Sequence, residues 1–171
     1  MNAMAKPPVG AAQFTAAMGL AATGVSVVTT DGPAGRFGLT VSAVSSVSAD
    51  PPLVLVCINR KSPAVAAVEA NGVFAVNLLS ARHRAYAETF AGRPREGRPF
   101  DFANHDWRDG ELSLPLVTDA TAIFECELHD RIDAGTHRIF IGRVVAAHRG
   151  EADPLVYCNR AFRRIVHHEG N

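Results

Sequence analysis

The chain has 171 residues, a length that fits one domain with a sizeable hydrophobic core. Its 17 basic and 17 acidic side chains give a formal net charge of zero, so no general attraction to nucleic acid or to an anionic membrane surface is expected. No stretch approaches the roughly 20 uninterrupted apolar residues of a membrane span. The three cysteines, Cys57, Cys126 and Cys158, form no C-x-x-C pair, and an odd number favours a reducing, cytoplasmic location over a disulfide framework.

The N-terminal part predicts an arm, a helix and a pair of strands. Residues 1–9 carry two prolines and few large apolar side chains, so we expect a flexible N-terminal arm. Apolar residues recur at helical spacing from Phe14 onward, which predicts a short helix that ends near Gly24. β-Branched residues favour a first strand over Val25–Thr30, and a Gly/Pro-rich loop leads into a second strand over Phe37–Val41.

Small hydroxyl side chains crowd the region after this second strand. No long polar side chain lies among them, so a flat heteroaromatic ring can rest against the surface that they form. Hydroxyl and backbone groups can pair with the carbonyls and ring nitrogens of an isoalloxazine. The candidates for such a flavin-binding surface are Thr40, Val41, Ser42, Ala43, Ser45 and Ser46. The alternative is a Ser/Thr-rich strand and turn whose hydroxyls satisfy one another.

A continuous apolar run from Leu53 to Ile58 predicts a strand that is buried on both faces, in the core of a barrel or sandwich. After this strand, Ser62 stands at a predicted N-cap and Pro63 at the first position of a helix. A helix N-terminus offers unpaired N–H groups and a partial positive charge. Four residues are therefore candidates for a phosphate site: Asn59, Arg60, Lys61 and Ser62.

The middle of the chain predicts a strand, a helix and a loop. Asn71-Gly72 is a turn signal before a strand over Val73–Leu79, and a helix is expected over Ala81–Phe90. Residues 92–100 contain glycine, proline and several charged side chains, which predicts an exposed flexible loop. Alternatively, the arginines of this loop reach a dinucleotide phosphate.

Further strands follow in the last third of the chain. Apolar residues alternate with Glu125 and Glu127, which predicts a strand with one face in the core and the glutamates outward. A long strand is expected over His137–Ala146 and a short last one over Leu155–Tyr157. Six or more strands with two or three short helices predict a mainly β fold, a Greek-key-like antiparallel barrel, because closure removes exposed strand edges. We expect one domain over residues 10–166, followed by a C-terminal tail over 167–171.

Other kinds of chemistry have no signature here. No G-x-G-x-x-G segment follows a strand, and neither a Walker sequence nor a G-x-S-x-G elbow occurs. The seven histidines include no pair with H-E-x-x-H spacing, so we predict no metal site. His137 opens a strand directly after a turn, where a side chain can project from a barrel rim. A structural or merely exposed histidine is the alternative at this position.

Several ordered segments together resemble the short-chain flavin reductases, the reductase components of two-component flavin monooxygenases. They are ATGVSVVTT, FGLTVSAVSSVSADPPLVLVCINRKS, NGVFAVNLL, GTHRIFIGRV and PLVYCNRAF, and their order spans nearly the whole chain. The resemblance implies an FMN-binding split barrel that transfers a hydride from NADH or NADPH to FMN or FAD. It also implies a homodimer with the flavin near the subunit interface, and a partner monooxygenase that receives the reduced flavin.

The same resemblance implies a catalytic role for His137, because in these reductases the histidine of a G-D-H segment lies near the flavin and the nicotinamide. Thr136 stands here in the place of that aspartate. Two rival functions remain open at this stage. One is a flavin-dependent oxidase of the pyridoxamine-phosphate oxidase type, and the other is a non-catalytic flavin binder or electron carrier.

Overall fold

The structure of the chain, a computed structural model, describes residues 6–103 and 105–166, so the expected tail 167–171 and most of the expected arm lie outside the described residues. Three helices are present in this part: α1 (Ala11–Met18), α2 (Ala64–Asn71) and α3 (Arg84–Phe90). The first strands are β1 (Thr23–Gly24), β2 (Ser26–Thr30), β3 (Phe37–Val41), β4 (Val44–Ala49), β5 (Pro52–Asn59) and β6 (Val73–Leu78). The later strands are β7 (Trp107–Asp109), β8 (Pro115–Val117), β9 (Ala122–Ala134), β10 (His137–Arg149), β11 (Val156–Cys158) and β12 (Ala161–Arg163).

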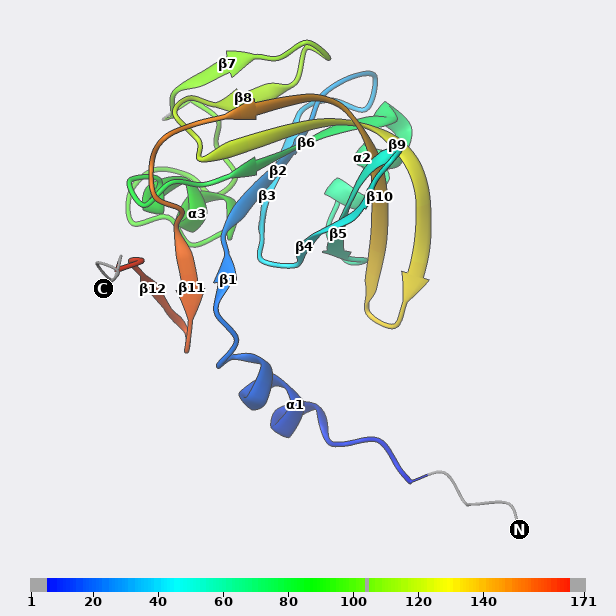
Figure 1. The fold of residues 1–171 in the computed structure, drawn as a ribbon, viewed down its shortest axis with the longest axis vertical. Helices are drawn as coiled ribbons and strands as arrows, with labels where there is room; N and C mark the ends of the chain where they lie inside the picture. The colour runs from blue at the N-terminus through cyan, green and yellow to red at the C-terminus, as the bar shows by residue number, and fades with distance from the viewer. Residues whose placement is uncertain (1–5, 104, 167–171) are drawn as a thin grey trace.

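Seven strands form one antiparallel sheet in the order β3, β2, β6, β9, β10, β5 and β4. Its two outermost strands, β3 and β4, are consecutive in the chain and are joined only by Ser42 and Ala43, so the sheet curls on itself (Figure 1). The Cys57 N–H donates to the Ala43 carbonyl at 3.0 Å beside this junction. We call the junction between β3 and the β4–β5 pair the seam. The mainly β antiparallel barrel expected from the sequence is confirmed.

The barrel interior is filled by apolar side chains from opposite strands and from α2. Phe74 of β6 and Phe140 of β10 are fully buried there, together with Val56 of β5. Gly142 permits this packing, because a Cβ at that position would lie 2.5 Å from the Phe74 ring. A second core cluster lies between the sheet, α3 and β8, and includes Phe90. These two clusters fix the strands on both sides of the seam.

Strand β5 differs from its prediction, since only one of its faces is buried. Val54, Val56 and Ile58 lie in the core, whereas Leu53 and Leu55 on the opposite face are partly exposed. The alternate apolar residues of this run therefore point in two directions. One set fills the core, and the other forms an outer face that the rest of the described chain does not cover. The outward position expected for Glu125 is wrong as well, because its side chain is fully buried.

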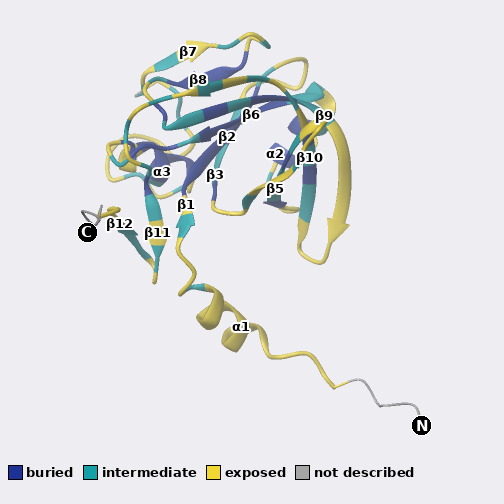
Figure 2. Ribbon diagram, in the orientation of Figure 1, coloured by how far each residue is buried: buried dark blue, intermediate teal, exposed yellow. Residues whose placement is uncertain are grey.

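The N-terminal helix also departs from its prediction. Helix α1 ends at Met18 rather than near Gly24, and none of its residues is buried. Figure 2 shows it as an exposed segment that projects from the barrel. Phe14 and Met18 are each more than half exposed. Helix α1 therefore does not pack into the core of the barrel.

Other boundaries shift by a few residues. Helix α3 begins at Arg84 rather than at residue 81, β10 extends to Arg149, and the predicted last strand begins one residue later, at Val156. Strand β8 pairs with β7, and neither of these short strands was predicted from the sequence. Strand β12, which was not expected, pairs with β11.

Candidate functional site

The residues predicted to bind flavin gather along the seam. Thr40 and Val41 end β3, Ser42 and Ala43 form the link to β4, and Ser45 and Ser46 lie on β4. Ser42, Ala43, Ser45 and Ser46 are exposed, Thr40 is partly buried, and Val41 is buried. The sequence forms this strip because small residues permit the close turn between the two edge strands. The strip is open to solvent and long enough to contact a flat ring.

The hydroxyl groups of this strip have different partners. The Thr40 hydroxyl donates to the Ala87 carbonyl of α3 at 2.8 Å, so it anchors the helix. The Ser45 hydroxyl donates to the Ser46 carbonyl at 3.1 Å. Within residues 6–103 and 105–166, the Ser42 and Ser46 hydroxyls make no hydrogen bond. Ser42 and Ser46 are thus the hydroxyls of the strip that remain available to a ligand.

The phosphate-site candidates follow β5 directly, but their backbone groups are already engaged. The Lys61 N–H donates to Asn59 Oδ1 at 3.0 Å, and the Ala64 N–H donates to Ser62 Oγ at 3.3 Å. Pro63, rather than Ser62, is the N-cap of α2. The expected unpaired N–H groups are therefore partly used inside the protein. What the segment offers to an anion is the Lys61 ammonium group and the Ser62 hydroxyl hydrogen.

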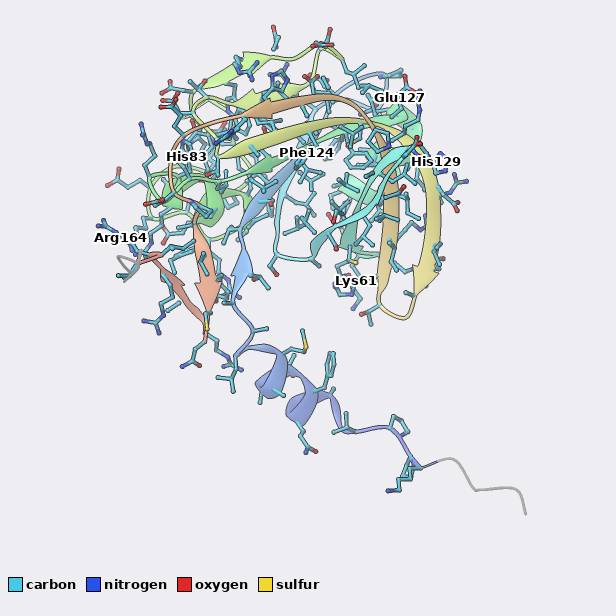
Figure 3. The ribbon with its side chains drawn as sticks, in the orientation of Figure 1. Lys61, His83, Phe124, Glu127, His129 and Arg164 are labelled. Carbon is cyan, nitrogen blue, oxygen red and sulfur yellow. The ribbon has the colours of Figure 1, made fainter. Side chains whose placement is uncertain are left out.

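Lys61 projects from the end of β5, beside the tip of the β9–β10 hairpin (Figure 3). Arg60 turns toward that hairpin, since its N–H donates to the Thr136 carbonyl at 3.0 Å and its guanidinium lies 3.6 Å from Asp133. The pKa of Asp133 is lowered, chiefly by its hydrogen bond from Arg138 and further by the charge of Arg60. Arg60 therefore links the predicted phosphate-site segment, residues 59–62, through its contacts with Thr136 and Asp133 to the hairpin that carries His137.

His137 stands at the start of β10, where it is the register partner of Asn59 in β5. Its side chain is exposed, and its Nδ1 lies 2.9 Å from the Thr136 hydroxyl. The threonine thus supplies a hydrogen-bond partner for the imidazole at the position where the resembling family has an aspartate. The structure brings His137 next to Asn59 and Arg60, but not into contact with the serines of the seam.

Two cavities flank β3. The larger, of about 530 Å³, lies between Thr40–Ser42, α3 and the β11–β12 hairpin, and three arginines line it: Arg84, Arg93 and Arg160. The smaller, of about 300 Å³, lies between the start of β3, Ser62 and two phenylalanines, Phe100 and Phe102. The predicted residues thus reach both cavities, one at each end of β3. Arg84, Arg160 and Phe162 were not among the residues predicted from the sequence, although the PLVYCNRAF segment contains two of them, Arg160 and Phe162.

The cysteines and histidines add no further chemistry to this site. Burial raises the pKa of the Cys126 thiol to about 12, and burial also raises the pKa of Cys57. Both thiols are therefore held in the protonated, unreactive form at neutral pH. In the part of the chain that the structure describes, no three His, Cys, Asp or Glu side chains gather as a metal site would require. His167 and His168 lie outside the described residues.

The seam and its two cavities bring the residues predicted to bind a flavin ring and its phosphate together beside β3 and β5, which favours a flavin-binding barrel. Comparison with known proteins gives the same class, since residues 18–166 match a family described as "Flavin reductase like domain". FMN reductase (NADH) RutF of Bradyrhizobium diazoefficiens is 43% identical over 151 residues, covering 87% of this chain and 82% of the relative. The RutF protein of Methylorubrum extorquens is 44% identical over 160 residues, covering 92% and 77%.

Solved structures agree with this relationship. Flavin reductase PheA2 superimposes with a TM-score of 0.85 at 32% identity, over 93% of this chain and 100% of that one. BorF, the flavin reductase component of a bacterial two-component tryptophan halogenase, gives a TM-score of 0.82 at 35% identity, over 93% and 100%. The chain belongs to the flavin reductase-like family. Both the resemblance inferred from the ordered segments and the split-barrel fold are confirmed.

Proposed function

We propose that this chain is an NADH-dependent FMN reductase that supplies reduced FMN to a partner monooxygenase. The observation that carries the proposal is the seam, where the Ser42 and Ser46 hydroxyls make no hydrogen bond to another described residue and lie beside β5, the strand that ends just before Lys61. A flavin ring on the serines and a flavin phosphate at Lys61 and Ser62 fit this arrangement. The names of the curated relatives, FMN reductase (NADH), favour FMN over FAD and NADH over NADPH.

The reaction needs little covalent chemistry from the protein. A flavin accepts a hydride at N5 from C4 of the reduced nicotinamide, so the chain's own residues have to bind and orient the two substrates. Lys61 and Ser62 hold the phosphate, and the serines hold the ring. His137, with its Nδ1 beside the Thr136 hydroxyl, can present Nε2 to the carboxamide of the nicotinamide. His137 is thus proposed to orient the reductant rather than to transfer a proton.

We further propose a homodimer, with the outer face of β5 and β10 as its interface. On this face Leu55 and Ile141 are register partners, Cys57 and Ile139 are another pair, and all four are partly exposed. Ala43 and Ser45 lie directly beside this face, because Ala43 bonds to Cys57 and Ser45 pairs with Leu55. A second copy that covers this face would therefore stand next to the proposed flavin ring.

We also propose a reducing, cytoplasmic location. Its support is the state of the thiols, since Cys57, Cys126 and Cys158 are all free. No helix in the described residues is long and apolar enough to cross a membrane.

A spectroscopic titration tests the proposed function. The purified protein is titrated with FMN and with FAD, and the oxidation of NADH and of NADPH is followed at 340 nm with catalytic amounts of each flavin. The proposal predicts turnover with NADH and FMN. A protein that binds FMN but oxidises neither dinucleotide would be the flavin binder, and the proposal would fail. Turnover of a phosphorylated amine with no nicotinamide requirement would instead favour the oxidase alternative.

A further inference from the structure

The hairpin between β11 and β12 has an unusual residue at its turn. Cys158 and Ala161 are register partners, so Asn159 and Arg160 form a two-residue loop, with φ angles of 49° and 58°. Positive φ at both central residues is the geometry of a type I′ turn, in which the second position favours glycine. Asparagine tolerates this conformation, but arginine is strained there. A strained arginine at an exposed turn points to a role for its side chain.

The side chain of Arg160 lines the 530 Å³ cavity beside the seam. Arg93, which lies in the loop just after α3, lines the same cavity. Neither guanidinium has an ion pair or a hydrogen bond with any other described residue. By contrast, Arg84 in the same cavity is paired with Glu88 at 2.7 Å, and Glu88 is also 3.1 Å from Arg95. Glu88, the acidic side chain that lines the cavity, is thus paired with arginines. Arg93 and Arg160 have no such partner among the described residues.

Aromatic rings stand next to the free arginines. Tyr157 and Phe162 are cross-strand partners whose ring centroids lie 5.4 Å apart in an edge-to-face arrangement, and both line the cavity. The Arg84 guanidinium lies over the Phe162 ring at 5.2 Å, so Phe162 is already stacked. The exposed Tyr157 ring remains available to a second flat group. Guanidinium groups bind phosphate oxygens in a bidentate way, and an aromatic ring can stack on a base. The cavity therefore has groups suited to both the pyrophosphate and the base of a dinucleotide.

We propose that this cavity binds the pyrophosphate and adenylate half of a dinucleotide, with Arg93 and Arg160 as phosphate ligands and Tyr157 against the adenine. Under the proposed function, on which this assignment rests, that dinucleotide is NADH. Ser42 lines the cavity and also belongs to the proposed flavin-binding strip, so the cavity opens directly onto the flavin. A dinucleotide bound with its adenylate here can extend its nicotinamide along the seam. FAD carries the same half, whereas FMN does not.

Two variants and a matched control test this assignment. Arg160→Gly removes the guanidinium and places the favoured residue at the turn, so it preserves the fold. Arg93→Ala removes the other ligand. Arg163→Ala is the control, because Arg163 lies on the same hairpin, carries the same charge and does not line the cavity. Each protein is assayed with NADH and with reduced nicotinamide riboside, which lacks both the pyrophosphate and the adenosine, and each is titrated with FMN and FAD.

The loss of one charge-assisted contact predicts that Arg160→Gly and Arg93→Ala each raise the KM for NADH about ten- to hundredfold. The KM for the riboside and the Kd for FMN should stay within about twofold of the wild type, and Arg163→Ala should leave every one of these constants within the same range. If the Kd for FAD rises and the KM for NADH does not, the site is supported but serves the flavin. If neither the KM for NADH nor the Kd for FAD is affected, or the KM for the riboside rises equally, the assignment is overturned.

Calorimetry with ADP-ribose separates this inference from the proposed function. ADP-ribose carries the pyrophosphate and the adenine but no nicotinamide, so its binding does not depend on flavin reduction. The cavity assignment predicts binding by the wild type and by Arg163→Ala, and a loss of at least about tenfold in Arg160→Gly. An active reductase that binds ADP-ribose equally with and without Arg160 would refute the assignment alone. A protein without reductase activity that still shows this loss would refute the proposed function alone.

Discussion

Asn59 and His137 are register partners across β5 and β10, so the residue that opens the phosphate segment and the proposed catalytic histidine share one barrel edge. His137→Ala should therefore slow flavin reduction by NADH while flavin affinity stays nearly intact. The hydride itself needs no acid or base from the protein, so we expect a loss of about ten- to a hundredfold, or roughly 1.4 to 2.7 kcal/mol. Stopped-flow reduction of bound FMN measures this effect.

The matched control for this variant is His129→Ala. His129 is also an exposed histidine of the β9–β10 hairpin, and Figure 3 places it on β9 at a distance from Lys61. The control should reduce flavin at the wild-type rate. Unchanged kinetics in His137→Ala, or a loss confined to its melting temperature, would remove His137 from the nicotinamide site.

Lys61 and Ser62 supply the side-chain donors of the proposed phosphate site. The double variant Lys61→Ala, Ser62→Ala should weaken FMN binding by about 2 to 4 kcal/mol, because it removes the charge-assisted contact of Lys61 and the hydroxyl donor of Ser62 from the phosphate. Fluorescence titration with FMN and with riboflavin, which has no phosphate, measures the effect. Equal losses for both flavins would mean that the two residues support the fold. Lys6→Ala removes the other lysine of the chain and should change neither affinity.

The outer face of β5 and β10 gives the dimer a direct test. Leu55→Arg places a charge in the centre of that face, so light scattering should detect a monomer of 18.2 kDa in place of a dimer. Val166→Arg is the matched control, because Val166 is apolar, 76% exposed and outside this face. A wild-type protein that is monomeric and fully active at micromolar concentration would contradict both the dimer and a flavin site at its interface.

Glu125 is fully buried, and its carboxylate accepts hydrogen bonds from the Leu112 N–H and from His148 Nε2, each at 2.9 Å. Burial alone would raise its pKa, but the bonds from Leu112, His148 and Glu111 outweigh burial and lower the pKa. A lowered pKa in the folded state stabilises the protein above the unfolded value of about 4.3. That stability is lost as the pH falls through the folded pKa.

Glu125→Gln should therefore reduce the free energy of unfolding at pH 7 by about 2 to 3 kcal/mol. It should also flatten the loss of stability below pH 5, because the titrating group is gone. Urea unfolding between pH 7 and pH 3 measures both effects. Glu127→Gln, on the same strand, removes only an exposed ion pair with Arg143 and should cost less than about 1 kcal/mol. A pH dependence equal to that of the wild type in Glu125→Gln would contradict the assigned role.

Strand positions were the most predictable part of this chain. β-Branched runs such as Val25–Thr30 and Val73–Leu79 lie within a residue of the observed β2 and β6, because both are core strands with local signals. Glu125 could not be placed, since its burial depends on donors from a loop and from His148, far away in the sequence. The alternation rule assigns a strand face, but it cannot anticipate such partners.

The candidate site was predictable only in part, for the same reason. The seam residues are contiguous in the sequence, so the strip from Thr40 to Ser46 was visible as a cluster of small side chains. The larger cavity joins β3 with α3 and with the β11–β12 hairpin, and only the fold brings these together. The strain at Arg160 depends on a backbone angle that composition does not reveal.

The chain is proposed to turn over free flavin rather than to reduce one bound flavin once. Under anaerobic conditions, a small amount of protein is mixed with a large excess of FMN and of NADH, and the FMN absorbance at 450 nm is followed. We expect the full excess of FMN to be bleached over many turnovers. Bleaching that stops at one FMN per subunit, or that does not occur, would contradict it.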